Sequence, residues 1–313
     1  MKKSLIENTP TNIIMGFLGA GKTTAILKLL KQKPANEKWA VLVNEFGSVG
    51  IDGAIYSSQG VAVKEVAGGC MCCVAGVSMR VAINALLKTI RPQRLLIEPT
   101  GLGHPKKVLD TLRGEGFRRS LHLKASICLL DPNKLKNTQY TEHENFIDQI
   151  AMCDVLIANK IDLADDESLQ RFDKLSHSAN PPKQLVAKVQ FGQLKREWLD
   201  LEANLERQAV YSDHHVNGST NDGFQTLAWE FDNQTIFDLS ILKNALERLK
   251  LERVKAVIKT TKGWFIVNAQ SDAINIMTAD NSASLQISKI EVIHPLLDKQ
   301  LLEQEWIVCK TVT

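Results

Sequence analysis

The chain has 313 residues, of which 44% are hydrophobic and 23% are charged, and its formal net charge is +3. These values are ordinary for a globular protein, the length suits two domains, and the small charge gives no support for nucleic acid as the main partner. No apolar stretch approaches the roughly 18 residues that a membrane helix needs, and the first residues lack the apolar core of a signal peptide. We therefore expect a cytoplasmic protein with no membrane partner, whose cysteines are metal ligands or buried thiols.

Predicted strands and helices alternate over the N-terminal part of the chain. Short runs of apolar residues predict strands at residues 11–15, 40–44, 61–66, 94–98, 125–130 and 154–158. Helical periodicity predicts helices at residues 22–31 and 77–89. Because several of the strands are apolar on both faces, we expect an α/β fold with a mostly parallel sheet flanked by helices.

The pattern changes after about residue 205. Residues 212–223 are rich in Ser, Asn, Asp and Gly, a composition that is typical of a linker. Beyond them we expect a small α+β domain with strands at 226–231, 254–260, 264–269, 274–277 and 287–293, a hairpin turn at 261–263, and helices at 237–249 and 295–304. The predicted division is a first domain at 1–210, a linker at 211–224 and a C-terminal domain at 225–313.

The segment after the first strand, GFLGAGKT at residues 16–23, matches the phosphate-binding pattern G-x-x-x-x-G-K-[ST]. Its glycines let backbone N–H groups approach phosphates, and the helix that follows adds positive potential at its N-terminus. We expect Lys22 to reach the β- and γ-phosphates and the Thr23 hydroxyl to bind Mg²⁺. The predicted phosphate-binding residues are Gly16, Gly19, Ala20, Gly21, Lys22, Thr23 and Thr24.

A second motif, Asn159-Lys160-Ile161-Asp162, follows the strand predicted at 154–158. A carboxylate in this position accepts hydrogen bonds from the N1–H and N2–H₂ groups of guanine, and adenine lacks both donors. Asp162 would therefore select GTP and GDP, while the aliphatic part of Lys160 can lie over the base.

The third motif, EPTG at residues 98–101, closes another apolar strand. Glu98 can hold Mg²⁺, usually through water, and the Gly101 N–H can sense the γ-phosphate. Leu102 stands where a small regulatory GTPase has a water-orienting Gln, so we expect slow intrinsic hydrolysis of GTP to GDP and phosphate. The residues predicted to support that reaction are Lys22, Thr23 and Glu98.

Three thiols, those of Cys70, Cys72 and Cys73, follow a glycine pair in a predicted loop. Tetrahedral Zn²⁺ usually takes four ligands, so three thiolates leave a position open for water, Glu45 or a group of a partner. Thiolates also accept Cu(I), and Co²⁺ is a further candidate. Two other interpretations stay open: cysteines packed as small hydrophobes, and a redox pair formed by Cys70 and Cys73.

The remaining cysteines, Cys128, Cys153 and Cys309, lie singly in apolar or terminal contexts, and we expect them in the core. The pair His214-His215 is a candidate second metal site, although a solvated pair in a linker is the simpler interpretation.

Five motifs in this order resemble the CobW-type metallochaperone GTPases, a group of P-loop GTPases that help metalloenzymes mature. They are residues 16–24, NEFG at 44–47, GCMCC at 69–73, EPTG at 98–101 and NKID at 159–162. Residues 255–265 are similar to the basic, glycine-containing strand pair of the C-terminal domain of that family. The resemblance therefore covers both predicted domains.

The resemblance implies GTP hydrolysis coupled to delivery of Zn²⁺ or Co²⁺ to a client metalloprotein, with Cys70, Cys72 and Cys73 as the metal ligands. It also implies that Glu45 lies near Mg²⁺ or the transferred metal in a switch-like segment, and it suggests a nucleotide-dependent homodimer. One departure is Ser48, where the family commonly has a second Glu after NEFG.

A second departure is that the histidine-rich tract of many relatives is reduced here to His214-His215, which weakens a role in metal storage. Two alternative functions stay open. The first is a regulatory GTPase whose cysteines form a structural zinc clip or a metal sensor. The second is a small-molecule kinase, against which the complete guanine motif argues.

Overall fold

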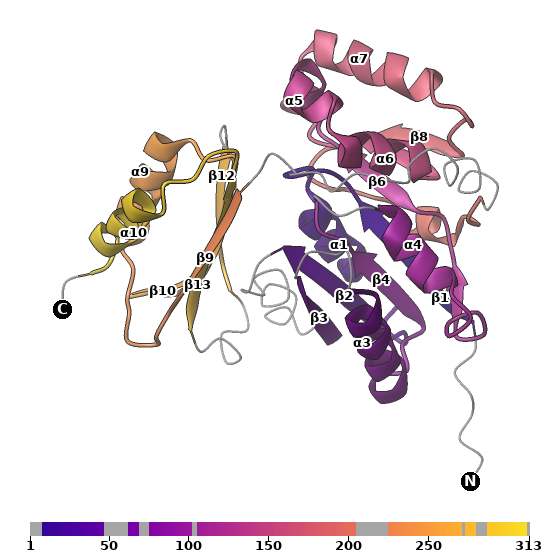
Figure 1. Ribbon diagram of the computed structural model, residues 1–313, viewed down its shortest axis with the longest axis horizontal. Coiled ribbons are helices and arrows are strands. Elements are labelled where there is room, and N and C mark those ends of the chain that lie inside the picture. Colours follow the sequence, from indigo (N-terminus) through magenta and orange to yellow (C-terminus); the bar gives the residue numbers. More distant parts are fainter. Residues whose placement is uncertain are drawn as a thin grey trace. The chain divides into compact units, whose positions relative to one another are not determined.

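The computed structural model describes residues 8–46, 62–68, 75–101, 105–204, 225–270, 273–279 and 287–311. These residues form two sheets, one mostly parallel and one antiparallel (Figure 1). The predicted α/β fold with an additional small α+β domain is confirmed. Within the described ranges, no helix is long and apolar enough to cross a membrane.

The larger sheet has the strand order β3-β2-β4-β1-β6-β7-β8, with β5 paired to β1. Its strands are β1 (Thr9–Met15), β2 (Trp39–Phe46), β3 (Ala62–Gly68), β4 (Arg94–Glu98), β5 (Leu121–Leu123), β6 (Ile127–Leu130), β7 (Val155–Ala158) and β8 (Leu185–Lys188). The pairings from β2 through β8 along this order are parallel. Strands β4, β6 and β7 are buried along their whole lengths, as expected for strands covered on both faces.

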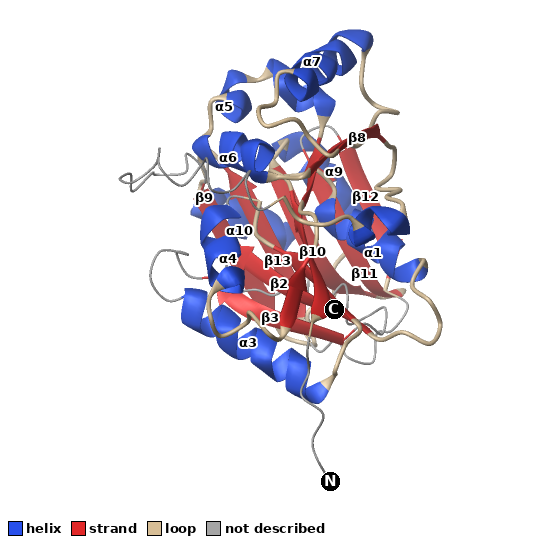
Figure 2. Ribbon diagram, turned by 90° about the vertical axis from the view of Figure 1, so that its right-hand side faces the viewer, coloured by secondary structure: helices blue, strands red, loops and turns tan. Residues whose placement is uncertain are grey.

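Helices cover this sheet on both sides. They are α1 (Lys22–Lys31), α3 (Ala75–Thr89), α4 (Pro105–Arg113), α5 (Thr138–Thr141), α6 (Glu144–Met152) and α7 (Asp166–His177), with 3-10 turns η1 (Pro132–Lys136) and η2 (Arg196–Asp200). Figures 1 and 2 show α3, α4 and α6 along one face and α1 along the other. Helix α1 has the predicted bounds, and it buries Ala25, Ile26 and Leu29, whose spacing places them on one side of a helix.

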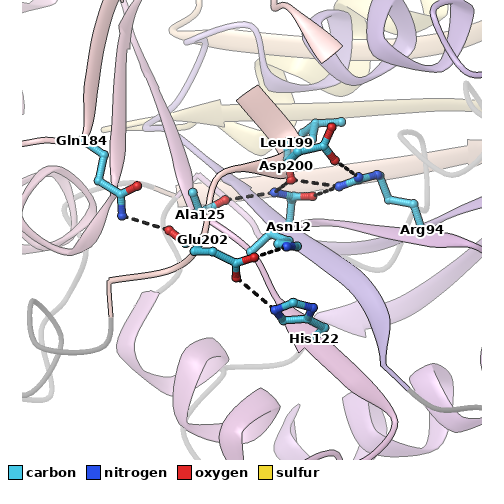
Figure 3. Close-up of polar contacts among 9 residues, drawn as sticks. Asn12, Arg94, His122, Ala125, Gln184, Leu199, Asp200 and Glu202 are labelled. Atoms are coloured by element: carbon cyan, nitrogen blue, oxygen red, sulfur yellow. Dashed lines mark hydrogen bonds and ion pairs between the residues drawn. The ribbon is translucent and has the colours of Figure 1, made fainter. Parts of the chain in front are cut away.

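A buried polar network holds η2 against the sheet (Figure 3). Arg94, the first residue of β4, donates to Asn12 Oδ1 at 2.7 Å and to the Leu199 carbonyl oxygen at 2.9 Å, and it also pairs with Asp200. Asn12 Nδ2 donates to the carbonyl oxygens of Ala125 and Leu199, each at 3.1 Å. Because buried polar groups are costly without partners, these bonds fix the chain that follows β8 near the start of β4. This network lies at the start of β4, and the candidate functional site lies at the opposite, carboxyl end of the strand.

The smaller sheet is antiparallel, with the strand order β12-β11-β10-β13-β9. Its strands are β9 (Gln225–Phe231), β10 (Arg253–Thr260), β11 (Gly263–Gln270), β12 (Ala273–Thr278) and β13 (Ser288–His294). Its helices α9 (Leu239–Leu249) and α10 (Lys299–Val308) share one core with alternate residues of the strands, such as Val254, Ala256 and Ile258 of β10. The predicted hairpin turn is confirmed, since Thr260 pairs with Gly263.

Aspartate caps set the starts of the two C-terminal helices. The Asp238 carboxylate accepts from the N–H groups of Ser240 and Ile241, and the Asp298 carboxylate accepts from that of Leu301. The helix predicted at 295–304 therefore begins only at Lys299, because the capping residue satisfies N–H groups that the first helical turn leaves unpaired.

Candidate functional site

The glycine-rich loop, residues 16–21, leaves the carboxyl end of β1 and enters α1, as predicted. Gly16, Gly19 and Gly21 have φ values of 149°, 72° and 94°, which glycine adopts without the strain of a side chain. A Cβ atom on Gly16 would lie 2.4 Å from the Leu129 carbonyl oxygen, and one on Gly21 would lie 2.5 Å from Asn159 Nδ2. Both space and backbone conformation therefore require glycine at these two positions.

The residues that follow the loop meet the end of β4. Lys22 is 4% exposed, and its Nζ donates to the Gly16 carbonyl oxygen at 2.8 Å, so its ammonium group lies at the glycine-rich loop. Thr23 Oγ1 donates to Glu98 Oε1 at 2.8 Å, and both side chains are buried. A hydroxyl and a carboxylate are the hard oxygen donors that Mg²⁺ prefers, so this pair could hold it.

The guanine-type motif lies at the end of β7, and its first residue joins two loops. Asn159 Nδ2 donates to the Ala20 carbonyl oxygen at 2.9 Å, and Asn159 Oδ1 accepts from the Gly192 N–H at 2.9 Å. Asp162 is exposed, so its carboxylate is accessible to a base. Lys160 has a φ of 63°, and its Nζ lies 3.2 Å from Asp131 Oδ2. The motif thus contacts the glycine-rich loop and still presents an accessible acceptor.

Neither Asp131 nor Gly192 was predicted from the sequence. Asp131 directly follows the apolar strand β6, and a carboxylate at a strand end was the available signal. Gly192 follows β8, a strand that was not predicted; its φ is 69°, and a Cβ atom there would lie 2.9 Å from the Ala25 nitrogen. Phe191 beside it is 54% exposed.

The EPTG segment packs directly on the glycine-rich loop. A Cβ atom on Gly101 would lie 3.0 Å from the Leu18 nitrogen and 3.2 Å from the Phe17 carbonyl carbon. The Gly101 carbonyl oxygen accepts a hydrogen bond from Gln149 Nε2 at 2.9 Å. Gln149 lies on α6 and was not identified from the sequence.

The predicted thiol site lies outside the described residues. This holds for Cys70, Cys72 and Cys73, for Ser48 and Leu102, and for His214-His215. Glu45 lies in β2, where its backbone is described and its side chain is not. Within the described ranges, no group of three or more His, Cys, Asp or Glu side chains could hold a metal ion.

The other three cysteines are buried, as predicted. A hydrogen bond with the Cys153 thiol and burial together raise the pKa of Cys128 well above its usual value. Burial likewise raises the pKa of Cys309 to about 11. Because the thiolate is the metal-binding form, these environments disfavour metal ligation.

Comparison with known proteins extends these observations. The profile of the CobW/HypB/UreG nucleotide-binding domain matches residues 10–187, which include the glycine-rich loop, EPTG and NKID. The chain is 40% identical over 307 residues to the zinc chaperone YeiR of Escherichia coli (strain K12), covering 91% of this chain and 93% of that protein. It is 30% identical over 197 residues to the zinc chaperone CobW of Pseudomonas aeruginosa, covering 53% of this chain and 52% of that protein.

Among solved structures, the Zn(II)-bound YjiA GTPase from E. coli aligns with 97% of this chain and 99% of its own chain, at 18% identity and a TM-score of 0.43.

Proposed function

This chain belongs to the CobW/HypB/UreG family, and from that premise we propose that it is a GTP-hydrolysing metallochaperone. It binds Zn²⁺, or alternatively Co²⁺, through Cys70, Cys72 and Cys73 and transfers the ion to a client protein under nucleotide control. For GTP binding, the observation that supports the proposal most directly is the 2.8 Å hydrogen bond between Thr23 and Glu98 beside the glycine-rich loop. The zinc half is supported by relatives that bear the name zinc chaperone.

In this proposal the phosphates lie on the glycine-rich loop. Lys22, now bonded to the Gly16 carbonyl oxygen, would turn its ammonium group toward the β- and γ-phosphates. The Thr23 hydroxyl and the Glu98 carboxylate would hold Mg²⁺, which when bound neutralises charge on the phosphate oxygens. The Gly101 N–H would contact the γ-phosphate, which only GTP carries.

The base lies at the NKID motif. Asp162 would accept from the two guanine donors, and the stem of Lys160 would lie along the base. The contact between Lys160 and Asp131 supports this role, because it holds the lysine head at the end of β6 and so limits where its stem can lie. Hydrolysis is slow in this proposal, since Leu102 cannot orient a water molecule as Gln does.

The proposal couples the two sites through the segments around the γ-phosphate. GTP would order the NEFG and EPTG segments, and hydrolysis would release them, so metal affinity would differ between the GTP and GDP states. By reciprocity, bound metal must then change nucleotide affinity by the same factor. The same proposal includes a nucleotide-dependent homodimer. It also includes the division into a first domain at 1–210, a linker at 211–224 and a C-terminal domain at 225–313. The alternative is a regulatory GTPase whose cysteines form an inert clip or a sensor.

Anaerobic titration with Co²⁺ and Zn²⁺ tests this proposal. Each metal is added with GTP, with GDP or without nucleotide, to wild type and to a variant with Cys70, Cys72 and Cys73 all replaced by Ser. We expect thiolate-to-cobalt absorption bands that depend on nucleotide in wild type and are absent from the variant. Cys309→Ala is the control, because it removes a thiol whose raised pKa disfavours ligation, and its bands should match wild type.

The outcomes separate the candidates. Cysteine-dependent binding that ignores the nucleotide would favour the structural clip. The absence of any cysteine-dependent binding would overturn the metallochaperone proposal.

A further inference from the structure

The segment of helices α5 and α6 packs against one side of the glycine-rich loop. The Phe17 ring of that loop is 4% exposed and meets three aromatic rings edge-on. The ring centroids lie 5.0 Å from that of Tyr140, 4.8 Å from that of His143 and 5.8 Å from that of Phe146. Such edge-to-face contacts stabilise a specific geometry, so the glycine-rich loop is held on the α5–α6 segment.

The same helix α6 holds the segment proposed to sense the γ-phosphate. Gln149 is 3% exposed, and its Nε2 donates to the Gly101 carbonyl oxygen at 2.9 Å. On its other side Gly101 lies so close to the Leu18 nitrogen that an added Cβ atom would meet it at 3.0 Å. The Gly101 peptide is therefore confined between the glycine-rich loop and the Gln149 amide.

Helix α6 is itself capped at both ends. At its start, His143 Nδ1 accepts from the Asn145 N–H at 3.2 Å. At its end, Lys183 Nζ donates to the carbonyl oxygens of Ile150, of Ala151 at 3.1 Å and of Cys153 at 3.0 Å. A cation there satisfies carbonyl groups that the last turn leaves unpaired and complements the helix dipole. Gln149 therefore projects from a capped helix toward Gly101.

We infer that Gln149 is a positioning residue for nucleotide discrimination: by holding the Gly101 carbonyl, it keeps the Gly101 N–H turned toward a γ-phosphate. The inference rests on the proposed function, in which the nucleotide is GTP and Gly101 senses its γ-phosphate. The carbonyl and the N–H of one residue are linked by only two soft dihedral angles, so fixing one group restricts the other. GDP lacks the γ-phosphate, so Gln149 contributes to GTP affinity and not to GDP affinity.

The test compares affinities for a non-hydrolysable GTP analogue and for GDP, each measured by titration with Mg²⁺. Gln149→Leu keeps the approximate size of the side chain and removes the donor. We expect the ratio of analogue affinity to GDP affinity to fall about three- to tenfold, the range for one neutral hydrogen bond, while GDP affinity stays unchanged. Gln139→Leu is the matched control, since Gln139 is exposed on the neighbouring α5, and its ratio should equal that of wild type.

Gln149→Glu separates hydrogen bonding from packing. An ionised carboxylate only accepts hydrogen bonds, so it cannot bond to the Gly101 carbonyl, whereas a protonated carboxyl can donate to it. Burial raises the pKa of a carboxyl. Relative to wild type at each pH, the Glu variant should therefore regain nucleotide discrimination as the pH falls, and the Leu variant should not. A purely structural role would not produce that recovery.

An unchanged ratio in Gln149→Leu, in a background where wild type binds both nucleotides, would overturn the inference and leave the proposed function intact. An equal loss of both nucleotides would also overturn it, because it would assign Gln149 to packing. If the Leu variant does not fold, the pH-dependent recovery of the Glu variant decides the question. Wild type that binds no guanine nucleotide would instead overturn the proposed function, and the inference with it.

Discussion

A buried carboxyl on β13 shows how strongly the fold can act on a single residue. Glu291 is 5% exposed and lies in register with Lys255 of β10. Within the described part of the chain, its Oε2 has no hydrogen-bond partner. Burial raises the pKa of Glu291 to about 7, although the positive charges of Arg253 and Lys255 act to lower it. Desolvation therefore outweighs two nearby cations at this site.

The raised pKa of Glu291 should make the free energy of unfolding depend on pH. Between pH 4.5, its ordinary pKa, and about 7, the folded protein retains a proton that the unfolded chain has released. The contribution of this protonation to the unfolding free energy is therefore fully present below about pH 4.5, and it is lost as the pH rises through 7. Because Glu291→Gln is neutral throughout, we expect the unfolding free energy of wild type, relative to that variant, to fall by up to about 3 kcal/mol across this range.

Urea denaturation at intervals from pH 5 to 8 measures this difference. Glu230→Gln on β9 is the matched control, because that carboxylate pairs with Lys289 and is half-exposed. The control should show little dependence on pH. A difference between wild type and Glu291→Gln that stays constant with pH would contradict the assignment.

At the scale of elements, the segment after β8 contacts the proposed nucleotide site. The Val189 N–H donates to the Ala158 carbonyl oxygen at 2.7 Å, and the Ile161 N–H donates to the Val189 carbonyl oxygen at 3.3 Å. Three residues further on, Gly192 lies against Ala25 of α1, and its N–H donates to Asn159 Oδ1. β8 and its following segment thus connect the NKID motif to the helix of the glycine-rich loop.

Gly192→Ala should therefore weaken GTP and GDP binding alike and lower stability by about 1–3 kcal/mol. The new methyl group would meet the Ala25 backbone at 2.9 Å, and the residue would keep a left-handed conformation at φ 69°. Thermal denaturation and nucleotide titration measure the two effects. The control is Gly116→Ala, where a Cβ atom meets nothing within 4 Å, and it should leave both quantities nearly unchanged. Equal effects of the two substitutions would contradict this account.

At the scale of the whole molecule, the described residues form two separate sheets, each with its own helices. The antiparallel sheet and its helices share a core that includes Phe237, Leu246, Ile258, Val292 and Trp306. The predicted nucleotide contacts, from the glycine-rich loop to NKID, belong to the parallel sheet and its loops.

Nucleotide should therefore stabilise the domain built on the parallel sheet selectively. At a concentration of about 100 times the Kd, binding adds about 2.7 kcal/mol to the folded state that binds it. We expect scanning calorimetry with Mg²⁺ and a GTP analogue to show the transition of the parallel-sheet domain moving to higher temperature, with the transition of the antiparallel domain unmoved. A single transition that shifts as a whole would show that the two domains unfold as one unit.

The sequence by itself determined the features that depend on neighbouring residues. It predicted the glycine-rich loop between β1 and α1, the bounds of α1, the hairpin at residues 261–263 and the α/β and α+β classes of the two domains, because periodicity and glycine placement act locally. It also produced the prediction of the thiol site at Cys70, Cys72 and Cys73, which lies outside the described residues and stays a prediction.

Only the tertiary structure decided which distant residues meet. Thr23 reaches Glu98 across 75 positions, and Gln149 reaches Gly101 across 48. Strand β8 is short and half-exposed, so its sequence carries little signal, yet it brings Gly192 to Asn159. Such contacts depend on the order of strands in the sheet and on which helix covers which face. Those choices are set by packing of the whole domain, and no local run of residues specifies them.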